Sequence, residues 1–236
     1  MPMRILIILL IVMTSCTSSL YTANTRNAPL FRDQGEAQLS GYVSSGGFEA
    51  QAAYALTDHI AAIGSYAYGT SKESTPDYTH KNINGEIGLG LFDRSRSFRY
   101  EVFAGYGFGQ VTDADQYYFY GPNIELVATS PLQRFFLQPS IGTNNRDFNL
   151  IFTPKLEWVN FSEFSTSAGT FKPKDTAPIF LEPALTSKLR INGNIHAIFQ
   201  LGVVLPVGSD PFFEYSKFQA ALGLQIDTGG LRTKVY

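Results

Sequence analysis

Apolar and polar side chains alternate along most of this chain, from about residue 35 onward. Between residues 48 and 56, Phe48 and Leu56 fall on one side of the alternation, and Glu49 and Gln51 fall on the other. A period of two is that of a β-strand with two unlike faces, whereas a helix would need apolar spacings of three and four. The chain is therefore predicted to be all-β. The same pattern runs through residues 82–91, 98–109 and 218–227.

Many of the predicted strands are long. A tilted strand needs about 9–11 residues to cross a bilayer, whereas strands of soluble sheets are most often about five or six residues long. The sequence therefore predicts a closed antiparallel up-and-down transmembrane β-barrel of about ten strands, forming one domain over residues 35–236. The predicted strands are residues 35–44, 47–56, 60–69, 81–92, 98–112, 131–142, 148–163, 178–191, 195–206 and 216–227.

Short and long connections alternate between these strands, as they do in barrels with short periplasmic turns and longer extracellular loops. An even number of strands then puts both chain ends in the periplasm. The tight turn at Ser45-Gly46 is an exception, because a longer outside loop is expected there. The predicted short turns are residues 57–59, 93–97, 143–147 and 192–194, and the long loops lie near residues 70–80, 113–130, 164–177 and 207–215.

The composition favours a membrane barrel over a soluble one. Charged residues make up 16% of the chain and aromatic residues 14%, and there are 21 glycines; a soluble domain has roughly a quarter charged residues. After residue 15 no apolar run reaches the ~20 residues of a membrane helix, so a spanning chain must close as a barrel. The alternative is a soluble barrel with its apolar face inward. A net charge of −2 gives no reason to expect a nucleic-acid partner.

The first residues resemble the export signal of a bacterial lipoprotein. Residues 1–15 combine Arg4, an apolar stretch and small residues before a cut. Cys16 follows, and as the only cysteine it has no partner within the chain. Residues 12–16 (VMTSC) resemble a lipobox, which implies that Cys16 becomes lipidated. The alternative is an ordinary signal cut slightly later, with Cys16 discarded.

Residues 16–34 read as a lipidated N-terminal tether, because they are polar, contain Pro29 and show no periodicity. In some lipoproteins an acidic cluster just after the cysteine resembles a surface-export signal, and no such cluster follows Cys16. The lipid is therefore expected on the periplasmic side.

The polar face of the predicted strands carries five acidic and five basic residues. Inside a narrow barrel a balanced set pairs across the lumen, whereas open selective pores tend to present rings of one sign. The hypothesis is a lumen plugged by paired charges that conducts little. The predicted network is Glu49, Glu86, Arg99, Glu101, Arg134, Lys155, Glu157, Glu182, Lys188 and Arg190.

Three prolines fall inside predicted strands, where each removes a backbone donor, and a closed barrel has no edge to accommodate them. Pro139, Pro154 and Pro183 therefore predict β-bulges, at positions that the sequence does not locate.

A catalytic site is hard to derive. Of the three histidines, only His80 falls at the outer rim, where Asp77, Ser71 and Glu73 are close in sequence. A lone loop histidine is usually a solvated surface group, so no catalytic residue is assigned beyond His80 as a candidate. No spacing of His, Cys or carboxylates indicates a metal, and no cofactor is expected. The acidic and aromatic loop 113–130 is either a recognition surface or a hairpin packed on itself.

Residues 21–31 (YTANTRNAPLF) and 53–59 (AYALTDH) resemble small outer-membrane β-barrel lipoproteins of the Bacteroidetes group. The resemblance implies a place and a fold more than an activity. Two classes of function remain. The first is a non-enzymatic barrel with a structural, docking or binding role, which contacts an outer-membrane assembly through loop 113–130 or the tether. The second is a rim enzyme acting on lipid, lipopolysaccharide or peptide through the His80 region. A narrow channel lies between the two.

Overall fold

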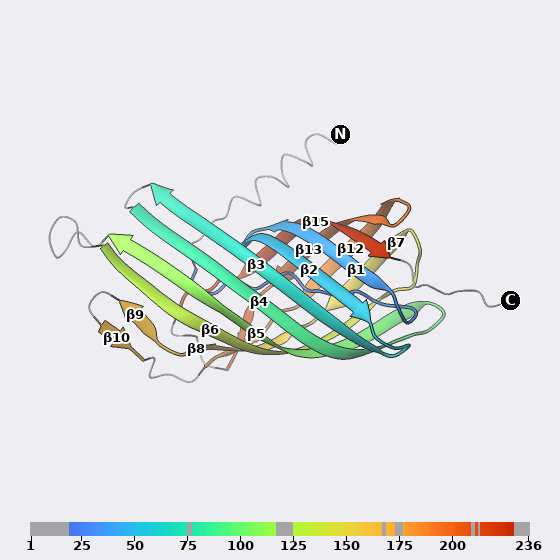
Figure 1. Ribbon diagram of the computed structural model, residues 1–236, viewed down its shortest axis with the longest axis horizontal. Coiled ribbons are helices and arrows are strands. Elements are labelled where there is room, and N and C mark those ends of the chain that lie inside the picture. Colours follow the sequence, from blue (N-terminus) through green and yellow to red (C-terminus); the bar gives the residue numbers. More distant parts are fainter. Residues whose placement is uncertain are drawn as a thin grey trace.

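The protein folds as a closed antiparallel barrel of ten strands, which confirms the predicted fold class (Figure 1). The computed structural model describes residues 19–74, 77–116, 125–166, 169–172, 177–208, 211 and 213–228. The predicted signal peptide and Cys16 lie outside the described residues. The barrel closes where β6 pairs with β7. The segments are β1 (Ala37–Ser44), β2 (Gly47–Ala55), β3 (Ile60–Ser74), β4 (Asp77–Arg94), β5 (Phe98–Gln116), β6 (Glu125–Thr143), β7 (Phe148–Thr153), β8 (Leu156–Phe161), β9 (Phe164–Thr166), β10 (Gly169–Phe171), β11 (Ile179–Leu181), β12 (Ala184–Asn192), β13 (Ile195–Val203), β14 (Leu205–Val207) and β15 (Phe218–Thr228).

Three of the ten wall strands are interrupted. β7 with β8, β11 with β12, and β13 with β14 each form one predicted strand; the first is broken near its middle, and the other two are broken about three residues from one end. The breaks keep the register, so the inward and outward faces do not exchange along any of the three strands. β9 and β10 form a small hairpin of their own beyond β8.

The large apolar side chains point outward. In β2, Phe48 is 66% exposed and Tyr54 47%, whereas the alternate residues Glu49 and Gln51 are buried. A soluble barrel would bury its apolar face, so this orientation excludes that alternative and gives the architecture of an outer-membrane β-barrel. In the described part of the chain there is no helix of the length and apolarity needed to cross a membrane.

The prolines do not mark bulges, and that prediction is wrong. One register joins β6 to both β8 and β7, so Pro139 and Pro154 lie opposite each other. Lys155 and Glu182 exchange both of their backbone hydrogen bonds, which turns the nitrogen of Pro154 toward β6. The two prolines therefore face each other at a position where two other residues would each have donated a backbone N–H to the carbonyl of the opposite residue. Pro183 sits beside Pro154 on the next strand, so the missing donors are concentrated in one place.

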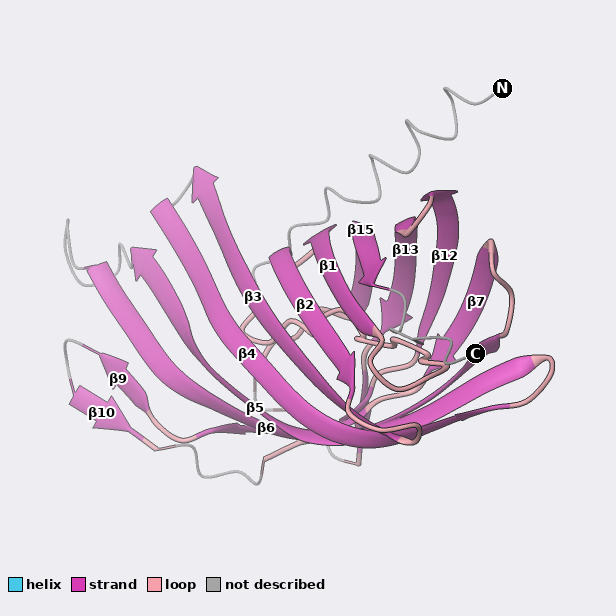
Figure 2. Ribbon diagram, turned by 45° about the vertical axis from the view of Figure 1, so that its right-hand side comes forward, coloured by secondary structure: helices cyan, strands magenta, loops and turns pink. Residues whose placement is uncertain are grey.

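Four neighbouring strands run farther than predicted. β3 and β4 reach residues 74 and 77, and β5 and β6 reach residues 116 and 125, so most of the predicted loop 70–80 is strand. The extensions of β3, β4 and β5 are polar, and this polarity suggested a loop, whereas that of β6 includes Leu126 and Val127. Hydrogen bonds between strands do not require apolar side chains, so a polar segment can still form a strand. Figure 2 shows β3 to β6 extending well past β1, β2 and β15, so the rim of the barrel on the long-loop side is uneven.

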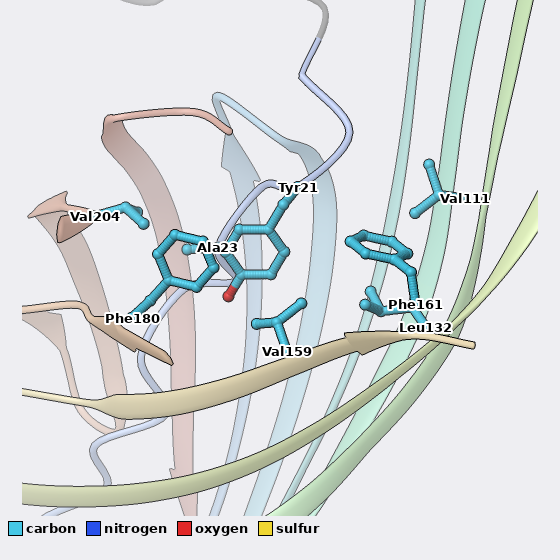
Figure 3. Packing of buried hydrophobic residues seen from close by; sticks show 8 residues of the cluster. All are labelled: Tyr21, Ala23, Val111, Leu132, Val159, Phe161, Phe180 and Val204. Atoms are coloured by element: carbon cyan, nitrogen blue, oxygen red, sulfur yellow. The ribbon is translucent and has the colours of Figure 1, made fainter. Parts of the chain in front are cut away.

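The core of the molecule lies inside the barrel and contains the N-terminal segment. Residues 19–34, which the sequence assigns to a tether, pass through the lumen, and we call them the plug (Figure 2). At one end Tyr21 stacks on Phe180 with ring centroids 5.0 Å apart (Figure 3). At the other, Phe31 is fully buried and packs against Phe92 and Phe103.

Candidate functional site: the filled lumen

The plug spans the barrel from one mouth to the other. At the long-loop mouth the amide of Tyr21 donates to the carbonyl of Glu214 at 3.2 Å, and the amide of Ser216 donates back to Tyr21 at 2.9 Å. At the short-turn mouth the amide of Gln34 donates to Asp58 at 3.2 Å. The plug then turns at Gly35, where φ is +81°, and enters β1. The start of β1 thus lies at the short-turn end, whereas Ser19 lies at the opposite end.

The backbone of the plug has few backbone partners, because it is not paired as a strand over most of its length. Buried carbonyls of this kind need a donor. Every carbonyl from residue 23 to residue 30 accepts a side-chain hydrogen bond. The donors, in order along the plug, are Gln219, Arg26, Gln51, Gln200, Gln138, Lys188, Gln38 and Arg99.

Five of these eight donors are glutamines, and they come from five different wall strands. Gln200 binds both backbone groups of one residue: its Oε1 accepts from the amide of Arg26 at 2.7 Å, and its Nε2 donates to the Arg26 carbonyl at 3.2 Å. The sequence reasoning missed the glutamines, although each occupies an inward position of the alternation. The glutamines carry no charge, and the plug that they bind has no periodic sequence pattern that would predict a buried segment.

Buried charges meet at the middle of the lumen. Arg134 contacts Glu86 at 3.2 Å and Glu157 at 3.3 Å, and Lys155 contacts both of these carboxylates at 2.9 Å. These four residues belong to the predicted network. The wall therefore supplies two cations and two anions that neutralise one another in a space without bulk water.

The plug adds one ion pair to this centre. Arg26 contacts Glu182 at 3.0 Å, and both side chains have no exposed surface. The hydroxyl of Tyr21 donates to the same carboxylate at 2.5 Å. Glu182 therefore binds the plug through an ion pair and a hydroxyl.

The other predicted network residues bind the plug or lie near the short-turn mouth. Glu49 accepts hydrogen bonds from the amide and hydroxyl of Thr25, and Glu101 accepts from the amide of Leu30 at 2.7 Å. Arg99 and Lys188 bind plug carbonyls, as described above. Arg190 lies 3.8 Å from Asp147 and is partly exposed. The lumen is thus closed by a segment of chain as well as by paired charges.

The cavities beside the plug differ in size. One of 130 Å³ lies near the short-turn mouth, where Arg32 and Arg99 line it. A cavity of 20 Å³ lies beside Pro29 and Leu30, lined also by Gln38 and Lys188. A single water needs about 10–15 Å³, so this cavity holds about one water molecule.

The histidines occupy three different settings. His80 lies in β4, is 7% exposed, and its Nδ1 is 2.7 Å from Oδ1 of Asp113 on β5. His59 is exposed in a turn, and His196 lies 3.4 Å from Asp227 near the short-turn mouth. The structure therefore pairs His80 with Asp113, a residue that the sequence placed at the edge of loop 113–130. The middle of that loop, residues 117–124, lies outside the described residues.

Strand register shows which of the residues expected near His80 lie directly beside it. Ser71 is the register partner of His80 in β3, and Asp113 is its register partner in β5. Glu73 and Asp77 pair elsewhere in the same hairpin. Among the residues that the structure describes, no group of three or more His, Cys, Asp or Glu is positioned to hold a metal ion.

No protein-family model matches the chain, and no curated protein matches it. Among solved structures, the translocator domain of the autotransporter NalP from Neisseria meningitidis has a TM-score of 0.49 and 10% identity, covering 81% of this chain and 86% of that one. Ail, the attachment invasion locus protein of Yersinia pestis, has a TM-score of 0.36 and 12% identity, covering 83% and 99%. OmpT, an outer membrane protein of Vibrio cholerae, has a TM-score of 0.25 and 8% identity, covering 87% and 100%.

Proposed function

We propose that this chain is a plugged outer-membrane lipoprotein with a non-enzymatic structural, docking or binding role, and that its lumen does not conduct. The observation that carries the proposal is the plug, whose consecutive carbonyls from residue 23 to residue 30 are each bound by a side chain. A transport path would have to displace this segment and expose the buried pair of Arg26 and Glu182. The outward apolar face supports insertion in the outer membrane.

Conductance of the purified barrel in planar bilayers tests the plug. The wild type is expected to give no steps above the bare membrane. Replacing Gln51, Gln138 and Gln200 together with alanine removes donors from three plug carbonyls, so we expect intermittent openings. Gln133→Ala is the matched control, because Gln133 lies on the outward face of β6. Steady conductance by the wild type would contradict the proposal and favour the narrow channel.

The lipid is the second part of the proposal, and the pattern of residues 12–16 supports it. Labelled palmitate is expected to enter the wild type but not the Cys16→Ala variant. Both are expected to shift on SDS gels when boiled, because the barrel does not need the lipid to fold. If the variant is labelled as strongly as the wild type, Cys16 is not the attachment site.

A rim enzyme is the competing function, and the pair of His80 and Asp113 is the observation that favours it. A histidine oriented by a carboxylate resembles the base of a hydrolase, and Ser71 is paired in register with His80. On our proposal, the folded barrel does not react with a serine-directed fluorophosphonate probe. Labelling that disappears in both His80→Ala and Ser71→Ala variants would replace the docking role with a hydrolase.

A further inference from the structure

The rim on the long-loop side is low where the plug reaches it. β1 and β2 are joined there by the tight turn Ser45-Gly46, and β15 begins only at Phe218, whereas β3 to β6 extend much farther. Figure 2 shows the short strands β1, β2 and β15 side by side, which makes one continuous low stretch of rim. The short connection that the sequence left as an exception is therefore part of this stretch.

The plug lies directly against the low rim. Thr22 touches the turn so closely that a Cβ added at Gly46 would lie 2.8 Å from its Cγ2 atom. Tyr21 is bound on the other side by the backbone of Glu214 and Ser216, in the connection that leads into β15. The hydroxyls of Ser19 and Thr22 are hydrogen-bonded at 3.2 Å, and Ser19 is buried. Side chains and backbone thus hold the plug at this point of the rim.

A mostly apolar groove of 840 Å³, bordered also by Glu214 and Lys217, begins at Ser19. Ser45 borders it on the β1 side, and Leu201, Val203 and Phe218 supply apolar lining from β13 and β15. Phe218 is 73% exposed and Leu201 46%, so the groove opens toward the outward, lipid-facing side of the wall. Cavities of this size hold drug-sized apolar ligands.

The distance along the chain decides which leaflet the anchor reaches. Cys16 precedes Ser19 by three residues, which extend at most about 10 Å. The hydrocarbon core of a bilayer is about 30 Å thick. With residues 19–34 held in the lumen, Cys16 cannot reach the leaflet on the short-turn side. The periplasmic placement expected from the sequence would require the plug to leave the barrel.

We propose that the lipid on Cys16 inserts into the leaflet on the long-loop side, which is the outer leaflet, with its acyl chains against the groove lined by β13 and β15. This inference rests on the proposed lipidation of Cys16. The barrel then encloses its own anchor segment, so the lipid is displayed on the cell surface without any acidic export signal.

Protease access on intact cells tests the sidedness. A tobacco etch virus protease site is inserted between residues 18 and 19, and a control site between Asp58 and His59 in a short turn. We expect external protease to cut the first site in intact cells, and to cut the second only after the outer membrane is permeabilised. Protection of the first site together with cleavage after permeabilisation would overturn the inference.

Palmitate labelling separates this inference from the proposed function. A first site that is cut in intact cells of an unlabelled protein would mean that the path of the plug is right and the lipidation wrong. A labelled protein whose first site is protected would mean that the lipidation is right and the path of the plug is wrong. Cutting a labelled protein is expected to leave the label on the short N-terminal fragment and the barrel in the membrane.

Photocrosslinking tests the groove on the unmodified chain. Cells are fed a palmitate analogue that carries a diazirine and an alkyne, and crosslinked peptides are identified by mass spectrometry after illumination. We expect the crosslinks within residues 199–220. Crosslinks that fall instead on outward residues near the short turns, such as Leu91 or Ile191, would place the lipid in the other leaflet and overturn the inference.

Discussion

Replacing Arg26 with methionine removes the cation by which the plug binds the centre of the barrel. Arg26 contacts the Glu182 carboxylate at 3.0 Å, and its Nε donates to the carbonyl of the same residue at 3.1 Å. Both side chains are fully buried. Glu182 would keep the hydroxyl of Tyr21 but lose its contacting cation. Removing one partner of a buried ion pair costs about 3–5 kcal/mol, so we expect a loss of stability of that size.

The free energy of unfolding is measured by urea titration in lipid vesicles, followed by the fluorescence of Trp158, the only tryptophan. Arg94→Met is the matched control. Arg94 pairs with Asp33 at 3.2 Å at the short-turn mouth, where its side chain is 41% exposed. Exposed pairs contribute about 0–1 kcal/mol, so this variant should stay close to the wild type.

The double variant Arg26→Met with Glu182→Gln isolates the cause. Glutamine carries no charge and still accepts from Tyr21, so we expect the double variant to recover most of the stability lost by Arg26→Met. If the double variant is as unstable as the single one, the uncompensated charge is not the cause. A loss of less than about 1 kcal/mol in Arg26→Met would refute the reasoning altogether.

Three further substitutions probe other parts of the structure by the same titration. Gly47→Ala should cost more than about 2 kcal/mol, because φ is +119° and the new Cβ would lie 2.3 Å from the Tyr68 carbonyl; a neutral result would contradict this turn geometry. Pro154→Ala should change stability by less than about 1 kcal/mol, since the one bond it can form to Pro139 is offset by greater freedom of the unfolded chain; a loss above about 2 kcal/mol would contradict the proposed proline pairing. Phe31→Ala should cost about 3–5 kcal/mol, because its ring is fully buried, and a small loss would mean that the plug end is not packed as described.

The wall of this barrel was predictable because its signal is local. Each strand shows its two faces within a few residues, and each short turn is marked by residues such as Asn192 and Gly193. The strand ends were less predictable at the polar extensions of β3 to β5, since a polar hairpin above a membrane has the composition of a loop. The prolines were misread for a related reason: the pairing of Pro139 with Pro154 depends on the register between strands, which one strand alone does not reveal.

The plug could not be predicted because its order comes mostly from distant residues. Arg26 binds Gln200 across 174 positions and Glu182 across 156. No periodicity is required of an extended segment whose partners surround it, so residues 19–34 look like a tether. The inward charges of the candidate site were visible as a set, but whether Glu49 or Lys188 binds another wall residue or the plug depends on a segment that the alternation does not mark.

The kind of contact that holds the plug explains why its own sequence is so plain. Glutamines such as Gln51 and Gln138 bind its carbonyls, and every residue type has a carbonyl. Side chains of the plug add specificity at certain points: Tyr21 and Arg26 bind Glu182, Thr25 binds Glu49, and Phe31 fills an apolar pocket near the short turns. Because the barrel wall binds the backbone of the plug, it constrains the path of the plug more tightly than it constrains which side chains the plug carries. That path determines at which mouth of the barrel Ser19 emerges.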